Sequence, residues 1–94
     1  MVECQNTKFS GHAIRRMFER KITKSDVISI IASGDNIAEY PDDSPYPSVL
    51  ISGFINERPL HIVIAVDHST GTCYVVTAYI PSTEQWADDY KTRR

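Results

Sequence analysis

The sequence predicts one α+β domain, in which two N-terminal helices pack on one face of a curved antiparallel sheet and a short C-terminal helix follows. Apolar residues recur at helical spacing between positions 11 and 31. Apolar, β-branched runs then fill most of positions 48–80. Between these regions lies the proline-rich stretch "YPDDSPYPS", which is typical of a loop. With 94 residues in total, we expect a single domain over 1–94.

The first helix is expected from Gly11 to Lys21, with Ser10 as its N-cap. Its apolar side consists of Ala13, Ile14, Met17 and Phe18. The second helix begins at "TKSD", where Thr23 and Asp26 form a capping-box pattern, and it is expected to stop at Gly34.

Four strands are expected after the helices. They are a short one at Ile37–Tyr40 and longer ones at Ser48–Ile55, Leu60–Asp67 and Cys73–Ile80. The tight links "NERP" and "HSTGT" predict that the last three form an antiparallel meander.

Hairpin geometry predicts which residues of the meander face each other. A loop at 69–71 with Gly71 in the left-handed conformation opposes Asp67 to Cys73, Val63 to Thr77 and His61 to Tyr79. A two-residue loop within "NERP" opposes Ile55 to Leu60 and Phe54 to His61. In this register one face is apolar and covered by the helices, while the other carries His61, Thr77 and Tyr79 and is the expected location of a site.

The segment after the meander, "STEQWADDYKTRR", predicts the C-terminal helix. Ser82 or Thr83 is its expected N-cap, and Trp86 and Tyr90 lie at i and i+4 on one side. We expect Trp86 to pack onto the sheet edge.

Composition and the N-terminal sequence predict where the protein is located and in which state its cysteines are. No stretch approaches the roughly 20 apolar residues of a membrane span, so no membrane partner is expected. The N-terminus lacks the pattern of a signal peptide, which predicts a cytoplasmic protein. There Cys4 and Cys73, which lack metal-ligand spacing, are expected to be reduced thiols without a function.

Charge is unevenly distributed, although the net charge is only −2. Six of the ten basic residues lie within the first 24 positions, and the acids Asp35, Glu39, Asp42 and Asp43 cluster later. The polar side of the first helix carries His12, Arg15, Arg16 and Arg20. Guanidinium groups bind phosphate in a bidentate manner, so these arginines are candidate RNA contacts, and an ordinary solvated helix face is the alternative.

His61 opposite Tyr79 is the candidate catalytic pair, because an imidazole and a phenol can act together as acid and base without a metal. His12, in the first turn of its helix, is a second candidate base. A purely structural hydrogen bond across the strands is the alternative for His61 and Tyr79. The three histidines are scattered, and the chain has no P-loop, dinucleotide or HExxH motif, so neither a metal nor a cofactor is expected.

The motifs "HAIRRMFERKI", "AEYPDDSPYPSVLISG", "RPLHIVIAVD" and "TAYIPSTEQW" resemble an uncharacterised family of small bacterial domains related to the RelE/ParE toxins. The resemblance runs from about Phe9 to Arg94 and implies a RelE-like fold. It implies messenger RNA cleavage without metal, in some relatives only on the ribosome, or gyrase inhibition as in ParE-like relatives. An antitoxin protein is the partner implied in either case. By position, the family's signature residues match His12, Arg16, Arg20, His61, Thr77, Tyr79 and Trp86.

Two functions are therefore expected. The first is a metal-independent endoribonuclease, in which His61 or His12 removes the 2′-OH proton and Tyr79 or the other histidine protonates the leaving oxygen. Arg16 and Arg20 would hold the phosphate, with Arg15 and Arg58 as further RNA contacts. The second is a binding module of the same fold without catalysis, which inhibits or docks a protein partner.

Overall fold

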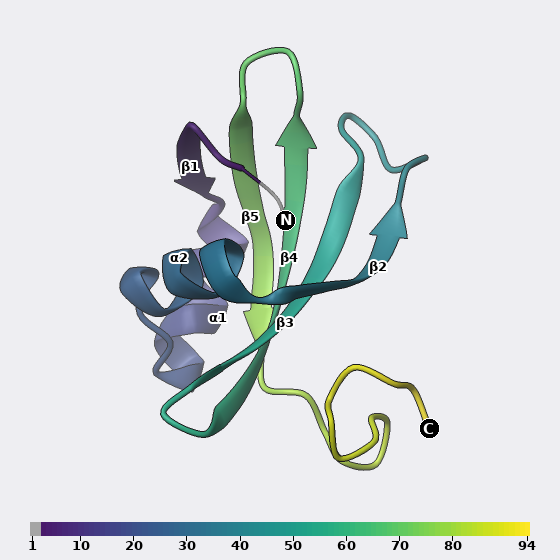
Figure 1. Cartoon of the computed structure of the whole chain (residues 1–94). Coiled ribbons are helices and arrows are strands. Elements are labelled where there is room, and N and C mark those ends of the chain that lie inside the picture. Colours follow the sequence, from purple (N-terminus) through teal and green to yellow (C-terminus); the bar gives the residue numbers. More distant parts are fainter. Residues whose placement is uncertain (1–2) are drawn as a thin grey trace.

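The computed structural model describes residues 3–94 and contains two helices and one five-stranded mixed sheet. The strands lie in the order β1-β5-β4-β3-β2, with β1 parallel to β5 and the other neighbours antiparallel (Figure 1). The elements are β1 (Asn6–Phe9), α1 (Gly11–Arg20), α2 (Lys24–Ser33), β2 (Asp35–Tyr40), β3 (Ser48–Ile55), β4 (Arg58–Asp67) and β5 (Thr72–Tyr79). The expected fold, with a purely antiparallel sheet after two helices and with a C-terminal helix, is wrong. A strand precedes the helices, and the last regular element is the strand β5.

Both helices begin and end near the expected residues because local chemistry fixes them. The Ser10 side chain accepts the Ala13 N–H at the start of α1. At the start of α2, Thr23 and Asp26 form the capping box. Gly34 follows α2 with φ −77°, so its role is close approach, since a Cβ there would lie 2.7 Å from Ile51 Cγ2.

The helices and the sheet share one hydrophobic core. α1 lies along β5, and α2 packs against β3 and β4; the chain after α2 then passes in front of the sheet to form β2 (Figure 1). Ala13, Met17, Val27 and Ile30 bury their side chains here. The sheet contributes the fully buried residues Ile51, Leu60, Ile62 and Ile64. With ten residues each, neither helix described in residues 3–94 is long enough to span a membrane.

The predicted register of β4 and β5 is confirmed at the His61–Tyr79 pair and is shifted by one residue nearer the loop. His61 opposes Tyr79 and Val63 opposes Thr77, as expected. A bulge in β5 next to the Val63 pair then adds one residue, so Cys73 opposes Val66 instead of Asp67. Because a one-residue shift reverses the faces, Cys73 and Val75 point into the core, whereas the expected core residue Val76 is 41% exposed.

The β3–β4 hairpin is tighter than expected. Its turn is Asn56-Glu57, with φ values of 50° and 71°, as a type I′ turn requires. Ile55 therefore opposes Arg58 instead of Leu60, and His61 opposes Ser52 instead of Phe54. A shift of two residues leaves every side chain on its expected face. In the β4–β5 loop, Gly71 takes the expected left-handed conformation with φ 73°.

The C-terminal segment, residues 81–94, forms turns and one β-bridge instead of the expected helix (Figure 1). Ser82 caps a single turn, since its Oγ accepts the Glu84 N–H. The Asp89 carboxylate then accepts the N–H groups of Lys91 and Thr92. These bonds compete with a helix, so the chain reverses and Trp86 forms a bridge with Arg93. We call residues 81–94 the C-terminal tail.

The two edges of the sheet differ. β1 covers only the first half of β5, and α1 lies beside the second half, where the Ser10 hydroxyl and the Arg20 guanidinium each donate to a β5 carbonyl at 3.4 Å. β2 forms the opposite edge. It has a bulge between Asn36 and Ala38 and carries the exposed acids Asp35 and Glu39.

Candidate functional site

The predicted pair of His61 and Tyr79 is formed. The His61 Nδ1 lies 3.1 Å from the Tyr79 hydroxyl across the β4–β5 ladder. The other ring nitrogen, Nε2, lies 2.6 Å from the Tyr90 carbonyl oxygen, which only an N–H can satisfy. The geometry therefore indicates the neutral tautomer that donates from Nε2 to Tyr90 and accepts the Tyr79 O–H at Nδ1. Both nitrogens of the imidazole are occupied.

The C-terminal tail covers this pair. Ser52 Oγ donates to the Tyr90 carbonyl at 3.1 Å, and the Trp86 ring packs edge-on against the His61 ring at 4.6 Å between centroids. As a result His61 has no exposed surface and Trp86 is 4% exposed. Trp86 packs on the face of the sheet instead of its edge. The face that the sequence predicts to be open is closed at its most reactive pair.

Burial also sets the protonation of the pair. Loss of solvent lowers the pKa of His61 from its usual 6.5, and the nearby charge of Arg93 lowers it further, although the Tyr90 carbonyl acts in the opposite direction. Burial raises the pKa of the Tyr79 phenol, which keeps it protonated. At neutral pH both groups are uncharged.

We expect stability to depend on pH through His61. Because its pKa is lower in the folded state, the unfolded chain binds the proton more readily, so the free energy of unfolding is fully present above pH 6.5 and falls as the pH decreases below it. Urea unfolding of the wild type and of His61→Gln between pH 7.5 and 5 measures this slope. The wild-type slope is expected to be steeper, and equal slopes would contradict it.

The four predicted arginines lie on α1 or at its C-terminus, and most of them contact other groups of the chain. Arg16 pairs with Glu19 at 2.9 Å on the surface of α1. Arg20 reaches the Ala78 carbonyl, as described above. Arg58 donates to the carbonyls of Arg20 and Lys21 at 3.3 and 3.1 Å, which caps the C-terminus of α1. Three arginines therefore make intramolecular contacts, and the fourth, Arg15, is exposed.

His12 does not join the His61 pair. It is exposed in the first turn of α1, whereas the His61 ring contacts Tyr79 of β5 and Trp86 and Tyr90 of the tail. The expected acid–base pair of two histidines is therefore not assembled in this conformation. Elsewhere in residues 3–94, no group of three His, Cys, Asp or Glu side chains is arranged as a metal site would be.

The outer surface of α1 shows a feature that the sequence analysis assigned to the core. Phe18 is 86% exposed and Ile14 is 39% exposed, because only Ala13 and Met17 face the sheet. The apolar side predicted from helical spacing is thus wider than the buried side. Within residues 8–24 these side chains lie among six basic residues and one acid, Glu19.

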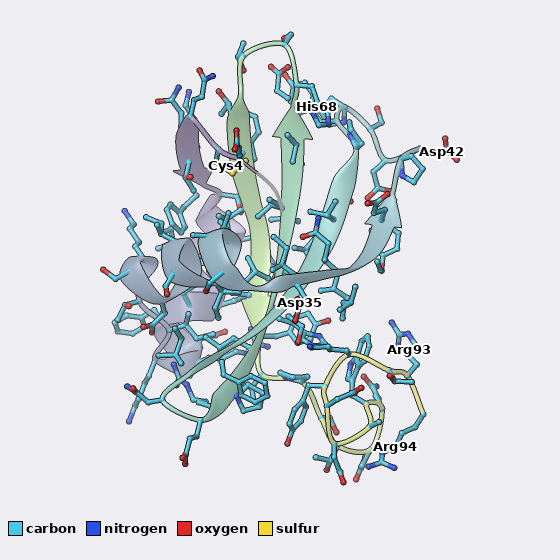
Figure 2. The ribbon with its side chains drawn as sticks, in the orientation of Figure 1. Cys4, Asp35, Asp42, His68, Arg93 and Arg94 are labelled. Atoms are coloured by element: carbon cyan, nitrogen blue, oxygen red, sulfur yellow. A yellow bond between two sulfur atoms is a disulfide. The ribbon has the colours of Figure 1, made fainter. Side chains whose placement is uncertain are left out.

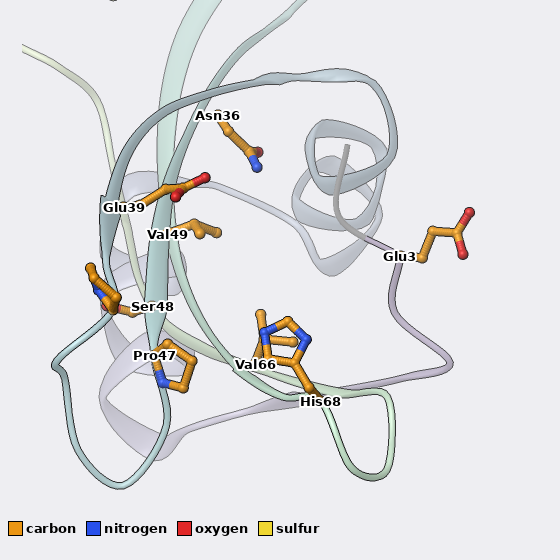
Figure 3. Close-up of a pocket in the computed structure, with 9 residues that line it drawn as sticks. Glu3, Asn36, Glu39, Pro47, Ser48, Val49, Val66 and His68 are labelled. Atoms are coloured by element: carbon orange, nitrogen blue, oxygen red, sulfur yellow. The ribbon is translucent and has the colours of Figure 1, made fainter.

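The larger of the two described cavities, about 680 Å³, lies elsewhere. It is lined mainly by Glu3, Asn36, Glu39, Val49, Val66 and His68 from β2, β3, β4 and the chain start (Figure 3). None of the seven predicted site residues lines it.

The two cysteines, expected to be free thiols, form a disulfide between Cys4 and Cys73. Its partners lie 69 positions apart, and β1 was not predicted, so no local pattern could have paired them. Trp86, Tyr90 and Arg93 were also not expected to surround His61, although the aromatic residues of the tail were a signal that it packs on something apolar.

Comparison with known proteins places the chain in a family. No curated protein and no solved structure matches it. A family model described as "Domain of unknown function (DUF4258)" matches residues 9–80, from the end of β1 to just past β5. That match covers most of the chain and excludes the tail that covers His61. The chain therefore belongs to the DUF4258 family.

Proposed function

We propose that the chain is a non-catalytic binding module that docks a partner protein through the outer surface of α1. The observation that carries this proposal is Phe18, whose ring is 86% exposed. Burying a phenylalanine side chain stabilises a fold or a complex by roughly 1.5–3 kcal/mol. The exposed Phe18 ring gives no such stabilisation to this fold, so a partner that covers the ring can gain it. Exposed aromatic residues of this kind are enriched in protein interfaces.

The charge around Phe18 indicates the chemistry of the partner. Arg15 is exposed near Ile14 and Phe18 on α1, and Lys21 and Lys24 follow the helix end. A partner segment that combines apolar side chains with carboxylates would complement this surface. The motif resemblance to a family related to the RelE/ParE toxins, for which an antitoxin protein is the implied partner, supports the same class of partner.

The state of the predicted catalytic residues also favours binding over catalysis. A general base needs a free nitrogen within reach of the substrate. Both nitrogens of His61 are bonded internally, and Arg20 and Arg58 contact backbone carbonyls of the chain itself. The Arg20 guanidinium reaches the carbonyl of Ala78, next to Tyr79 in β5, but there it is bonded to the backbone of the chain.

We expect Phe18→Ala to weaken binding of a synthetic acidic, amphipathic Leu/Glu helical peptide about 30-fold, which corresponds to roughly 2 kcal/mol for an aromatic anchor. Fluorescence anisotropy with a labelled peptide measures the change. Ile28→Ala, at a 50% exposed residue of α2, is the matched control and is expected to bind normally. Equal affinity of the wild type and Phe18→Ala would refute the role of this surface.

A metal-independent endoribonuclease is the second candidate, and the hydrogen bond between His61 and Tyr79 is the observation that favours it. Arg93, which belongs to the C-terminal tail, stacks on Trp86 next to the pair and so brings a guanidinium charge near His61 and Tyr79. Incubation of the chain with a labelled RNA, with and without ribosomes, separates the two proposals. The binding proposal expects intact RNA, whereas cleavage that Tyr79→Phe abolishes would establish the nuclease.

A further inference from the structure

The start of the chain is attached to the sheet by the Cys4–Cys73 disulfide (Figure 2). We call residues 3–9 the N-terminal segment; it contains Cys4 and β1. Cys73 lies in β5 with no exposed surface, and its side chain belongs to the hydrophobic core. Cys4 is only partly buried. The disulfide therefore joins a peripheral strand to the centre of the molecule.

Apart from the disulfide, few contacts hold the first part of the N-terminal segment, and its main apolar attachment is Phe9, which packs against the core with Lys24 over its ring. None of the side chains of residues 3–9 is fully buried. β1 is four residues long and pairs with a single strand. The N–H groups of Gln5 and Asn6 share one acceptor, the Gly71 carbonyl, at 2.8 and 3.4 Å. A cavity of about 440 Å³ separates the segment from Ile28, Ile31 and Ala32 of α2, so packing on that side is incomplete.

The rest of the fold has its own attachments directly after this segment. The Ser10 N–H donates to the Val75 carbonyl at 3.2 Å, and the Ser10 hydroxyl caps α1. The buried side chains of Ala13 and Met17 then fix α1 to the core.

We propose that the disulfide is a redox-controlled latch: its reduction by a dithiol releases the N-terminal segment and uncovers the β5 edge at Thr72–Val75, while the rest of the domain stays folded. A reductant thiolate attacks the Cys4 sulfur, because Cys73 is shielded, and the S–S bond breaks with Cys73 leaving as a thiolate that takes a proton. The second reductant thiol then displaces Cys4 as a thiol. The two electrons come from the dithiol, which becomes a disulfide.

The uncovered edge is the functional consequence of the latch. The β5 residues that pair with β1 would present free backbone groups that another strand can bind, except for the Val75 carbonyl, which stays bonded to the Ser10 N–H. The Cys73 thiol stays among apolar side chains, where a free cysteine behaves as a small hydrophobic residue. Release of the N-terminal segment therefore leaves a neutral Cys73 thiol in the core and no buried charge.

Hydrogen exchange read by mass spectrometry tests the latch on the whole chain, with and without dithiothreitol. We expect reduction to remove amide protection from residues 5–9 and 72–75 and to leave β4 protected. Cys4→Ser is the matched variant, and it is expected to show the open pattern in both conditions. Iodoacetamide should label Cys4 of the reduced wild type and leave the buried Cys73 unlabelled while the domain is folded.

Two outcomes would overturn the latch. If residues 5–9 keep their protection both in the reduced wild type and in Cys4→Ser, the strand is held without the disulfide. If β4 loses protection together with β1, the disulfide holds the whole fold and opens no local edge.

Discussion

Replacing Trp86 with alanine is expected to destabilise the domain by about 3–5 kcal/mol, the usual cost of truncating a buried tryptophan. Trp86 is 4% exposed and lies against the His61 ring. The Arg93 guanidinium carbon lies over the Trp86 ring, 4.6 Å from its centroid. Truncation would remove the main apolar contact of the tail and give water access to His61. Urea unfolding followed by tyrosine fluorescence or circular dichroism measures the loss.

Trp86→Phe is the control for this experiment, because it keeps an aromatic ring in the same place. We expect it to lose much less stability than Trp86→Ala, and the histidine pKa measured by NMR should shift toward 6.5 only in the alanine variant. If Trp86→Ala kept the wild-type stability, the tail would contribute nothing to the fold.

Loss of the disulfide is the second large expected effect. Cys4 and Cys73 are 69 positions apart, so the closed loop contains both helices and the strands from β1 to β4. Chain-entropy arguments give about 4 kcal/mol for a loop of this length, through the greater freedom of the unfolded chain. Urea midpoints of the oxidised, reduced and Cys4→Ser chains measure it, and identical midpoints would contradict it. Most of this effect belongs to the unfolded state, so it is compatible with a native fold that opens only at β1.

The helices and hairpins could be predicted because adjacent residues determine them. Ser10 caps the helix three residues before Ala13, and Thr23 and Asp26 cap each other across the same distance. Gly71 tolerates the left-handed conformation that its loop needs. Each of these features needs only a few neighbouring residues.

The features that the sequence did not predict depend on distant contacts. β1 is short and pairs with a strand more than 60 positions later, so its own four residues carry little signal. The tail has a helical pattern, but the Asp89 carboxylate binds backbone N–H groups that a helix would use. A bulge near Val76 depends on how β4 and β5 pair, and no glycine or proline marks it.

The candidate site was predictable only in the part that strand alternation determines. Strand alternation placed His61 opposite Tyr79, and the later shifts in register did not change that pair. Alternation indicates a face of the sheet but not what covers it. The burial of His61 under Tyr90 and Trp86 required knowledge of the tail, and the exposure of Phe18 required knowledge of how α1 rests on β5.

The outer edge of β2 determines how copies of the domain behave at high concentration. The unpaired backbone N–H and C=O groups of an edge strand can bind the same strand of another molecule, and repeated pairing of this kind builds fibres. Here the irregular pairing at Asn36–Ala38 prevents regular alignment with a straight strand, and the exposed Glu39 carboxylate adds a negative charge to the edge, while that of Asp35 pairs with Lys91 at 2.7 Å. We therefore expect concentrated samples at neutral pH to stay dispersed instead of growing into strand-paired polymers.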